Sequence, residues 1–281
     1  MNSTFNYHYS LNDAERWAEF SGDYNPIHFD LQQAQHLGQV QLTVHGMRAM
    51  LDIKYQLSTA LLPLLPGGEF LRFNARLRQP VQCHTSYQLQ LSEAAGQVSG
   101  NLIDICSGES CFTGKLRCAP ALVQTGTEWV SLSADDVFQF SQQFLGDASQ
   151  SAECWSFFDA LLFKLLVAAP QTLATVKQVL PGMATVKQVL PGIEAETLID
   201  VFKSVPVIQT HHDVHFSTDL LRINHPNVFV RSALHYAIEP TLIVGNPTDG
   251  WVLRAAIAAR FDSGPLITTA VTLKTWPLAA H

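Results

Sequence analysis

The sequence predicts an α+β fold in which two units of similar plan follow each other along the chain. In the first half, an apolar helix over roughly 46–62 precedes four strand-like runs. The second half repeats this order. The chain has 281 residues, of which 47% are hydrophobic, enough for two packed units of roughly 100–200 residues each. We therefore expect one unit in residues 1–120 and a second in residues 121–281.

A helix begins after Ser10 and leads into the most informative loop of the chain. Ser10 and Asp13 have the spacing of a helix N-terminus. The helix delivers Asp23 into the loop Ser21-Gly22-Asp23-Tyr24-Asn25-Pro26-Ile27-His28. Its apolar face is formed by Leu11, Ala14, Trp17, Ala18 and Phe20.

The next helix, from about Gly46 to Leu62, is apolar enough to lie buried against a sheet, and Pro63 ends it. Four strand-like runs follow, separated by turn residues such as Gln79-Pro80 and Ser107-Gly108. Their approximate ranges are 69–78, 81–93, 97–107 and 110–118.

The second half restates the helix start with Ser133 and Asp136, and Gly146-Asp147 lies where Gly22-Asp23 lay. Ala152 then takes the place of His28, and no Asn-Pro follows Asp147. An apolar helix at about 154–168 lacks a His-Gly start. Strand-like runs are expected at roughly 212–221, 227–238, 251–261 and 265–276.

Residues 174–193 contain a tandem duplication of ten residues, each copy including Pro-Gly. Two copies are too few for a repeat array. We interpret the duplication as a recent insertion in a connecting region; a lid or a partner-binding segment is the alternative.

A histidine-rich run, Thr210-His211-His212-Asp213-Val214-His215, lies in the second half. On a strand, His211, Asp213 and His215 would share one face, where they could bind a transition metal. Strand histidines are commonly just exposed polar positions, so we predict no metal here.

Asp23 and His28 have the chemistry to share one water and to take a proton from it near neutral pH. Pro26 stiffens the loop between them by fixing its own φ and restricting Asn25. The Gly46 amide would lie in the first turn of a helix, where N–H groups lack partners and the dipole favours negative charge. These parts suit acid/base chemistry on an activated carbonyl compound.

Residues 20–30 and 44–47 closely resemble the signature of MaoC-like, hydratase-2 type (R)-specific enoyl-thioester hydratases and dehydratases, which are hot-dog folds. The matching pattern is Ser-Gly-Asp-x-Asn-Pro-x-His-x-Asp, followed by Ala34 and by His-Gly-Met at about the family's distance. The resemblance implies a hot-dog unit, in which an antiparallel sheet wraps around a central helix. Because the second half repeats the order of elements, we expect a double hot-dog, with the catalytic motif in the first unit alone. The resemblance also implies reversible syn addition of water to a trans-2-enoyl thioester.

Carried over by position, the resemblance makes Asp23 and His28 the catalytic pair and assigns the thioester oxygen to the Gly46 amide. Asn25 and His45 fall on the oxyanion and substrate-binding part of the motif, where Asn25 supports the loop. The family uses no metal, and we expect no cofactor.

Two rival functions remain open. A hot-dog thioesterase would hydrolyse the same class of substrate and release a free thiol. A non-catalytic acyl-binding or partner subunit would need no intact motif, so the complete set from Asp23 to His28 argues against it. The expected substrate is a thioester of coenzyme A or acyl carrier protein in fatty acid or related acyl metabolism. A homodimer is also open.

Composition excludes several other classes. A formal net charge of −7 argues against nucleic acid as a partner. The first residues lack the features of a secretory signal, and no apolar run approaches the roughly 18 residues of a membrane span. The five cysteines lack zinc-ligand spacing. We expect a cytoplasmic protein without membrane or nucleic-acid contacts.

Overall fold

The computed structural model describes residues 3–65, 70–94, 96–123, 128–147, 153–174, 176–177, 195–222, 233–246, 248–262 and 264–275. Within these ranges, one eleven-stranded sheet has the order β1-β5-β6-β7-β3-β10-β13-β12-β11-β8, and β9 pairs in parallel with β11. The strands of this sheet are β1 (Thr4–His8), β3 (Phe70–Leu77), β5 (Ser86–Ala94), β6 (Gln97–Asp104), β7 (Ser110–Ala119), β8 (Val130–Leu132), β9 (Val176–Lys177), β10 (Val207–Ser217), β11 (Leu234–Asn246), β12 (Gly250–Phe261) and β13 (Gly264–Thr275).

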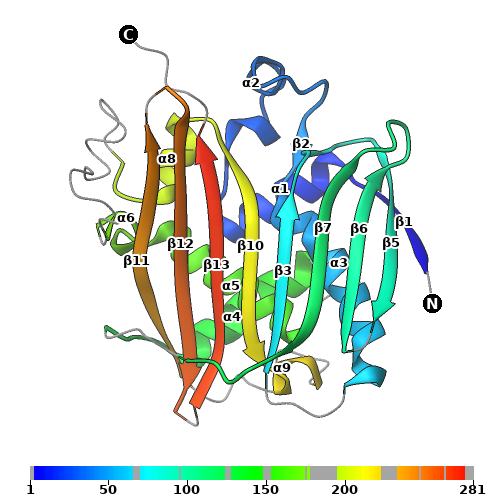
Figure 1. The fold of residues 1–281 in the computed structure, drawn as a ribbon. Helices are drawn as coiled ribbons and strands as arrows, with labels where there is room; N and C mark the ends of the chain where they lie inside the picture. Colours follow the sequence, from blue (N-terminus) through cyan, green and yellow to red (C-terminus); the bar gives the residue numbers. More distant parts are fainter. Residues whose placement is uncertain are drawn as a thin grey trace.

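The long helices α3 and α5 lie against one face of this sheet (Figure 1). The first packs on β5, β6 and β7, and the second on β12 and β13. No helix in the described ranges is both long enough and apolar enough to cross a bilayer. The helices are α1 (Leu11–Ser21), α2 (Leu31–His36), α3 (Gly46–Leu61), α4 (Ala134–Asp147), α5 (Cys154–Ala168), α6 (Gln171–Ala174), α8 (Leu198–Ser204) and α9 (Asp219–Arg222), with short 3₁₀ turns η1 (Pro26–His28) and η2 (Leu62–Leu64).

The two halves share the sheet through β3 and β10, which pair antiparallel at its centre. Arg72 and Asp213 strengthen this junction on the outer face, with Arg72 Nε 3.0 Å and Nη2 2.5 Å from the two carboxylate oxygens. Each half therefore contributes strands and a central helix to one continuous structure, in agreement with the predicted α+β class.

A pair of glycines lets α3 approach the sheet closely. Gly100 and Gly114 lie opposite each other on β6 and β7. A Cβ atom at Gly114 would lie 3.2 Å from Ile53 of α3 and 3.1 Å from Phe73. Any larger residue would push the helix outward, so these positions explain how the predicted apolar helix becomes buried.

The strand expected at 81–93 is broken, because His84 adopts a left-handed backbone conformation with φ of 57°. The chain turns there, and the His84 N–H donates to the Tyr9 carbonyl at 2.7 Å. The first part becomes β4 (Val81–Gln82), which pairs with β2 (Thr43–Val44) in a separate ladder, and β5 begins at Ser86. The edge strand β1 was not predicted, since its five residues are too few for a clear alternation.

Two strand boundaries in the second half also differ from the prediction. The run expected at 212–221 is β10 from Val207 to Ser217, after which Leu220 and Leu221 are buried by the short helix α9. The run expected at 227–238 begins at Leu234 and continues past Pro240, where the pairing with β12 shifts register. Proline has no N–H to donate, so it is accommodated at such an irregularity.

Several expectations stay predictions. Of the duplication, only Ala174 and β9 lie in the described residues, and Ala152 lies outside them. The boundary expected at residue 120 falls directly after β7.

Candidate active site

Asp23 is positioned by the end of α1. Ser10 precedes the first residue of the helix, and its Oγ donates to the Asp13 carboxylate at 2.8 Å. Gly22 follows the last residue of the helix and has a φ of 81°. This left-handed residue turns the chain directly before Asp23. The Asp23 N–H then donates to Ser21 Oγ at 3.1 Å, and Asp23 Oδ1 accepts the Asn25 N–H at 3.2 Å. The carboxyl group is therefore held by its own loop.

Asn25 connects this loop to the second half of the chain. Its Nδ2 donates to the Val207 carbonyl on β10 at 3.1 Å, and its Oδ1 accepts the Ile27 N–H at 3.4 Å. These contacts tie the loop to β10. The loop-supporting and substrate-binding roles that the resemblance implies for Asn25 stay predictions.

His28 presents one unprotonated nitrogen toward the centre of the site. Its Nδ1 lies 2.9 Å from the Thr43 carbonyl oxygen and 2.9 Å from Thr43 Oγ1. Because a carbonyl oxygen only accepts, Nδ1 carries the hydrogen and Nε2 keeps its lone pair. Burial lowers the pKa of His28 to about 4, so the ring is neutral at pH 7.

His45 packs against His28, with ring centroids 3.6 Å apart and an angle of 30° between the ring planes. Its Nε2 donates to the Asp23 carbonyl at 2.8 Å and lies 4.0 Å from Asp23 Oδ2. Its Nδ1 is buried and has no hydrogen-bond partner among the described residues. Burial, reinforced by His28, lowers the pKa of His45 well below its usual value. His45 is thus a neutral side chain that closes one side of the site.

The pKa of Asp23 is raised, whereas the pKa values of His28 and His45 are lowered. Burial raises the pKa of Asp23 to about 7, partly offset by the hydrogen bond from the Asn25 N–H. A carboxyl with a pKa near 7 and a neutral imidazole with a free nitrogen therefore face the same space. This combination suits proton transfer at neutral pH.

Gly46 is the first residue of α3, and no acceptor for its N–H is found within the described ranges. The helix dipole adds to the positive potential at this point. A Cβ atom at Gly46 would lie only 2.5 Å from Leu77 Cδ2, so glycine is required unless Leu77 moves. The free amide can therefore bind an oxyanion.

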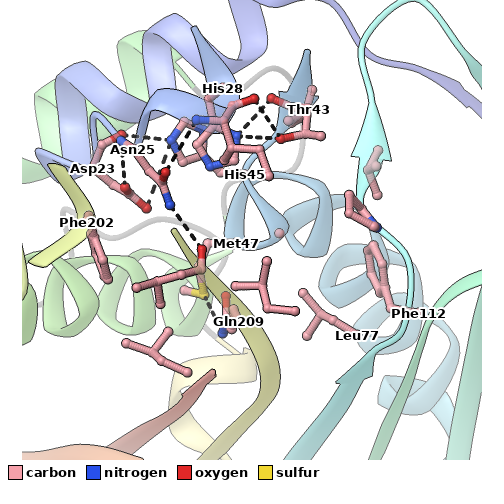
Figure 2. Close-up of a pocket in the computed structure, with 18 of the residues that line it drawn as sticks. Asp23, Asn25, His28, Thr43, His45, Met47, Leu77, Phe112, Phe202 and Gln209 are labelled. Carbon is pink, nitrogen blue, oxygen red and sulfur yellow. Dashed lines mark hydrogen bonds and ion pairs between the residues drawn. The ribbon is translucent and has the colours of Figure 1, made fainter. Parts of the chain in front are cut away.

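One pocket joins these groups to apolar side chains from both halves of the chain. Figure 2 shows five residues gathered at one end, and the apolar residues and Gln209 lie below them. The five are Asp23, Asn25, His28, Thr43 and His45. The first half contributes Met47, Leu77 and Phe112 to the lining, and the second half contributes Phe163, Phe202, Val207, Gln209 and Leu273.

Sequence reasoning did not identify which residues the second half contributes to the pocket. Gln209 and Phe202 belong to segments whose position depends on the pairing of β10 with β3. Nothing in the residue type or the neighbouring sequence of Gln209 and Phe202 indicates that they lie at the pocket. Thr43 was also missed, although it lies only two residues before His45.

Asp23, His28 and His45 could also hold a metal ion, because one ligand atom from each lies within 4.8 Å of the other two. Two of these residues, Asp23 and His28, are also the ones that acid/base chemistry would use, and the expectation of no metal stays a prediction.

Asp213 and His215, from the predicted set of His211, Asp213 and His215, are bonded to other groups of the protein. As the sequence predicts, these three share the outer face of β10 while His212 is buried. Asp213 pairs with Arg72, and His215 Nε2 donates to the Pro120 carbonyl at 2.9 Å. Within the described residues, this set forms no metal-binding cluster.

At the corresponding place in the second half, α5 begins after Glu153 and carries no histidine along its length. The Glu153 carboxylate instead accepts from Trp155 Nε1 at 2.9 Å. Among the described residues, the start of α5 therefore has no histidine that corresponds to His45.

No protein-family model matches the chain, and no curated protein matches it. Among solved structures, it is similar to a MaoC-like dehydratase with 11% identity and a TM-score of 0.50, covering 98% of this chain and 97% of the other. A putative oleoyl thioesterase from Lactobacillus plantarum has 8% identity and a TM-score of 0.49, covering 99% and 96%. An (R)-hydratase from A. caviae involved in PHA biosynthesis has 17% identity and a TM-score of 0.32, covering 42% and 95%.

The match to the MaoC-like dehydratase extends over nearly the whole of both chains. It confirms the double hot-dog fold that the sequence predicts, and at this identity it shows the fold alone.

Proposed function

We propose that this chain is a MaoC-like hydro-lyase that reversibly hydrates trans-2-enoyl thioesters to (R)-3-hydroxyacyl thioesters. The observation that carries the proposal is the arrangement of a neutral His28, a carboxyl with a pKa of about 7 and an unpartnered Gly46 amide around one pocket. The (R) configuration comes from the sequence resemblance.

The substrate would place its thioester carbonyl oxygen on the Gly46 N–H and its C3 atom opposite Asp23 and His28. A water between these two side chains has two hydrogens to donate. One hydrogen bonds to the lone pair of His28 Nε2, and the other bonds to the Asp23 carboxylate. With both hydrogens bonded in this way, the lone pairs of the water oxygen are directed at C3.

Asp23 is the better base of the two. A base with a pKa near the working pH is the most effective, and the pKa of about 7 for Asp23 meets this condition better than the value of about 4 for His28. As water adds to C3, its proton moves to Asp23 and negative charge develops on the thioester oxygen, where the Gly46 amide stabilises it. The Asp23 carboxyl then returns one proton to C2. Dehydration is the same path reversed.

The apolar lining beyond Gly46 suits an acyl chain, since Met47, Leu77, Phe112 and Phe202 offer little that a polar substituent could bind. At the pocket, Arg78 is exposed, and its charge suits a phosphate-bearing carrier. The carrier is coenzyme A or acyl carrier protein, and the protein would act in the cytoplasm in fatty acid or related acyl metabolism.

The test follows the loss of enoyl-thioester absorbance with crotonyl-CoA and a medium-chain trans-2-enoyl-CoA, with a free-thiol assay in parallel. Wild-type protein should remove the absorbance without releasing thiol. Asp23→Asn should lower the rate by roughly 10²–10⁴-fold. Asp135→Asn is the matched control, because Asp135 is exposed on α4, and it should keep the full rate.

Other outcomes assign a different function. Thiol release would support the thioesterase. A rate in Asp23→Asn close to that of the wild type would exclude the proposed base. Absence of both signals with coenzyme A and carrier-protein substrates would leave a non-catalytic acyl-binding or partner subunit.

A further inference from the structure

A fully buried polar cluster lies between the two central helices, and the proposed chemistry does not use it. It consists of Lys54 from α3, Asp159 from α5, His212 from β10 and Thr269 from β13, each at most 1% exposed. The Asp159 carboxylate accepts from Lys54 Nζ, from Thr269 Oγ1 at 2.7 Å and from His212 Nε2 at 2.9 Å. A buried carboxylate with this many donors is held in one position.

The cluster defines which nitrogen of His212 carries a hydrogen. An ionised carboxylate only accepts, so His212 Nε2 must donate to Asp159. Burial raises the pKa of Asp159, but His212 and Lys54 outweigh it and hold that pKa well below its usual range. The nitrogen end of the Gln209 amide faces the His211 carbonyl oxygen and Met47 Sδ, which both accept, and His212 Nδ1 faces the same NH2 group, so Nδ1 is an acceptor.

Gln209, on the pocket side of the cluster, is oriented by this acceptor. Its Nε2 lies 3.2 Å from His212 Nδ1, 3.5 Å from the His211 carbonyl oxygen and 3.7 Å from Met47 Sδ. All three neighbours are acceptors. Turning the amide over would bring Oε1 against them, so the buried cluster holds the amide in a single orientation.

The other end of the amide is therefore presented to the pocket. Gln209 lines the same pocket as Asp23 and His28 (Figure 2). A Cβ atom on Gly46 would lie 3.6 Å from Gln209 Oε1, so the two residues are close neighbours. No donor to Oε1 is found in the described part of the chain. An acceptor next to the proposed thioester oxygen site thus lacks a partner.

We infer that Gln209 Oε1 accepts a hydrogen bond from the first amide N–H of the thioester's carrier arm, an inference that rests on the proposed function. In the thioesters of coenzyme A and of acyl carrier protein alike, two methylene groups separate the sulfur from an amide. The enoyl group has no N–H or O–H between C1 and C3. The carrier-arm amide is therefore the first donor beyond the thioester bonded at Gly46. Gln209 is a specificity-determining residue, and His212 is its positioning residue.

The test compares two substrates that differ in one group. Crotonyl-S-(N-acetyl)cysteamine keeps the amide N–H, and the crotonyl thioester of 2-acetoxyethanethiol replaces N–H by an oxygen. With wild-type protein, kcat/KM should be about tenfold higher for the amide. Gln209→Met keeps the side-chain length and removes the acceptor, so the two substrates should become equal. Gln143→Met, at an exposed position on α4, is the control that should keep the tenfold ratio.

His212→Leu tests the positioning role. With the acceptor gone, the Gln209 amide can turn, and the ratio between the two substrates should fall. A purely structural loss would slow both substrates equally and leave the ratio unchanged. An unchanged ratio in Gln209→Met would overturn the inference, and so would an equal rate for both substrates in the wild type.

Binding separates a failure of the inference from a failure of the proposed function. Calorimetry with the saturated butyryl pair of the same two thioesters requires no turnover. Tighter binding of the amide to wild-type protein, absent in Gln209→Met, would uphold the contact even if no hydration were found. Equal binding of the pair by wild type would reject the contact even if hydration were active.

Discussion

Replacing Asp23 by asparagine should make the folded protein more stable, although it removes the proposed base. The Asp23 side chain is only 13% exposed, so solvent screens its charge weakly. It lies 4.0 Å from a histidine that is neutral at pH 7, and burial raises its pKa to about 7. An ionised carboxylate here costs the folded state free energy, and an asparagine of the same shape does not.

The size of this effect follows from the difference in pKa between the two states. In the unfolded chain an aspartate titrates near 3.8, and in the folded protein this one titrates at about 7. About three pKa units correspond to about 4 kcal/mol once the group is ionised in both states.

The sign of the pH dependence is determined by which state keeps the proton. Between about pH 4 and about pH 7 the folded state holds the Asp23 proton while the unfolded chain releases it. The contribution of this group to stability is therefore present at the acidic end and is lost as the pH rises to 7. The asparagine variant lacks this loss, so its advantage grows over the same window.

Urea denaturation at about pH 5.5 and about pH 8 measures this growth. The free energy of unfolding of Asp23→Asn, relative to the wild type, should increase by roughly 2 kcal/mol between the two conditions. The titration of His28 is common to both proteins and cancels in the difference. Asp135→Asn should show no such increase, since Asp135 is exposed. The reasoning would be refuted if Asp23→Asn had the same advantage at both pH values.

Three further predictions concern the same site and the buried cluster. The hydration kcat/KM should rise with pH through about 7, as Asp23 loses its proton, and a pH–rate profile that falls over this range would exclude Asp23 as the base. Gly46→Ala should lower hydration by roughly 10–100-fold, because the new Cβ lies 2.5 Å from Leu77 Cδ2 and displaces the amide; Leu77→Ala in the same chain should restore part of the rate in the absorbance assay. Lys54→Met should lower the free energy of unfolding, measured by urea denaturation, by about 3–5 kcal/mol, because the buried Asp159 carboxylate loses its positively charged partner. The double variant Lys54→Met with Asp159→Leu should recover most of that loss. A double variant less stable than Lys54→Met alone would contradict the role of the ion pair.

Local features of the fold and site could be predicted from the sequence because they depend on residues close together in the chain. Ser10 with Asp13 predicts the start of α1, and the spacing from Asp23 to His28 predicts one loop that carries both. The inward direction of His212 also follows from simple strand alternation.

The partners of these groups could not be predicted, since they come from distant segments. Lys54 was placed only within an apolar helix, and its carboxylate partner lies 105 residues away. Gln209 touches Met47 across 162 residues, through a pairing of β3 and β10 that no local pattern encodes. The break at His84 was missed because a single left-handed residue leaves the alternation of its neighbours intact.

The ladder between β3 and β10 has a consequence for how such a chain can evolve. It brings a pocket wall from the second half, including Phe202 and Gln209, to the acid/base residues of the first. Under the proposed function, mutations in this wall can alter which thioester is accepted while Asp23 and His28 stay unchanged. The two halves of the chain can thus come under different selection, with one half retaining the proposed reaction and the other free to follow a changing supply of substrates.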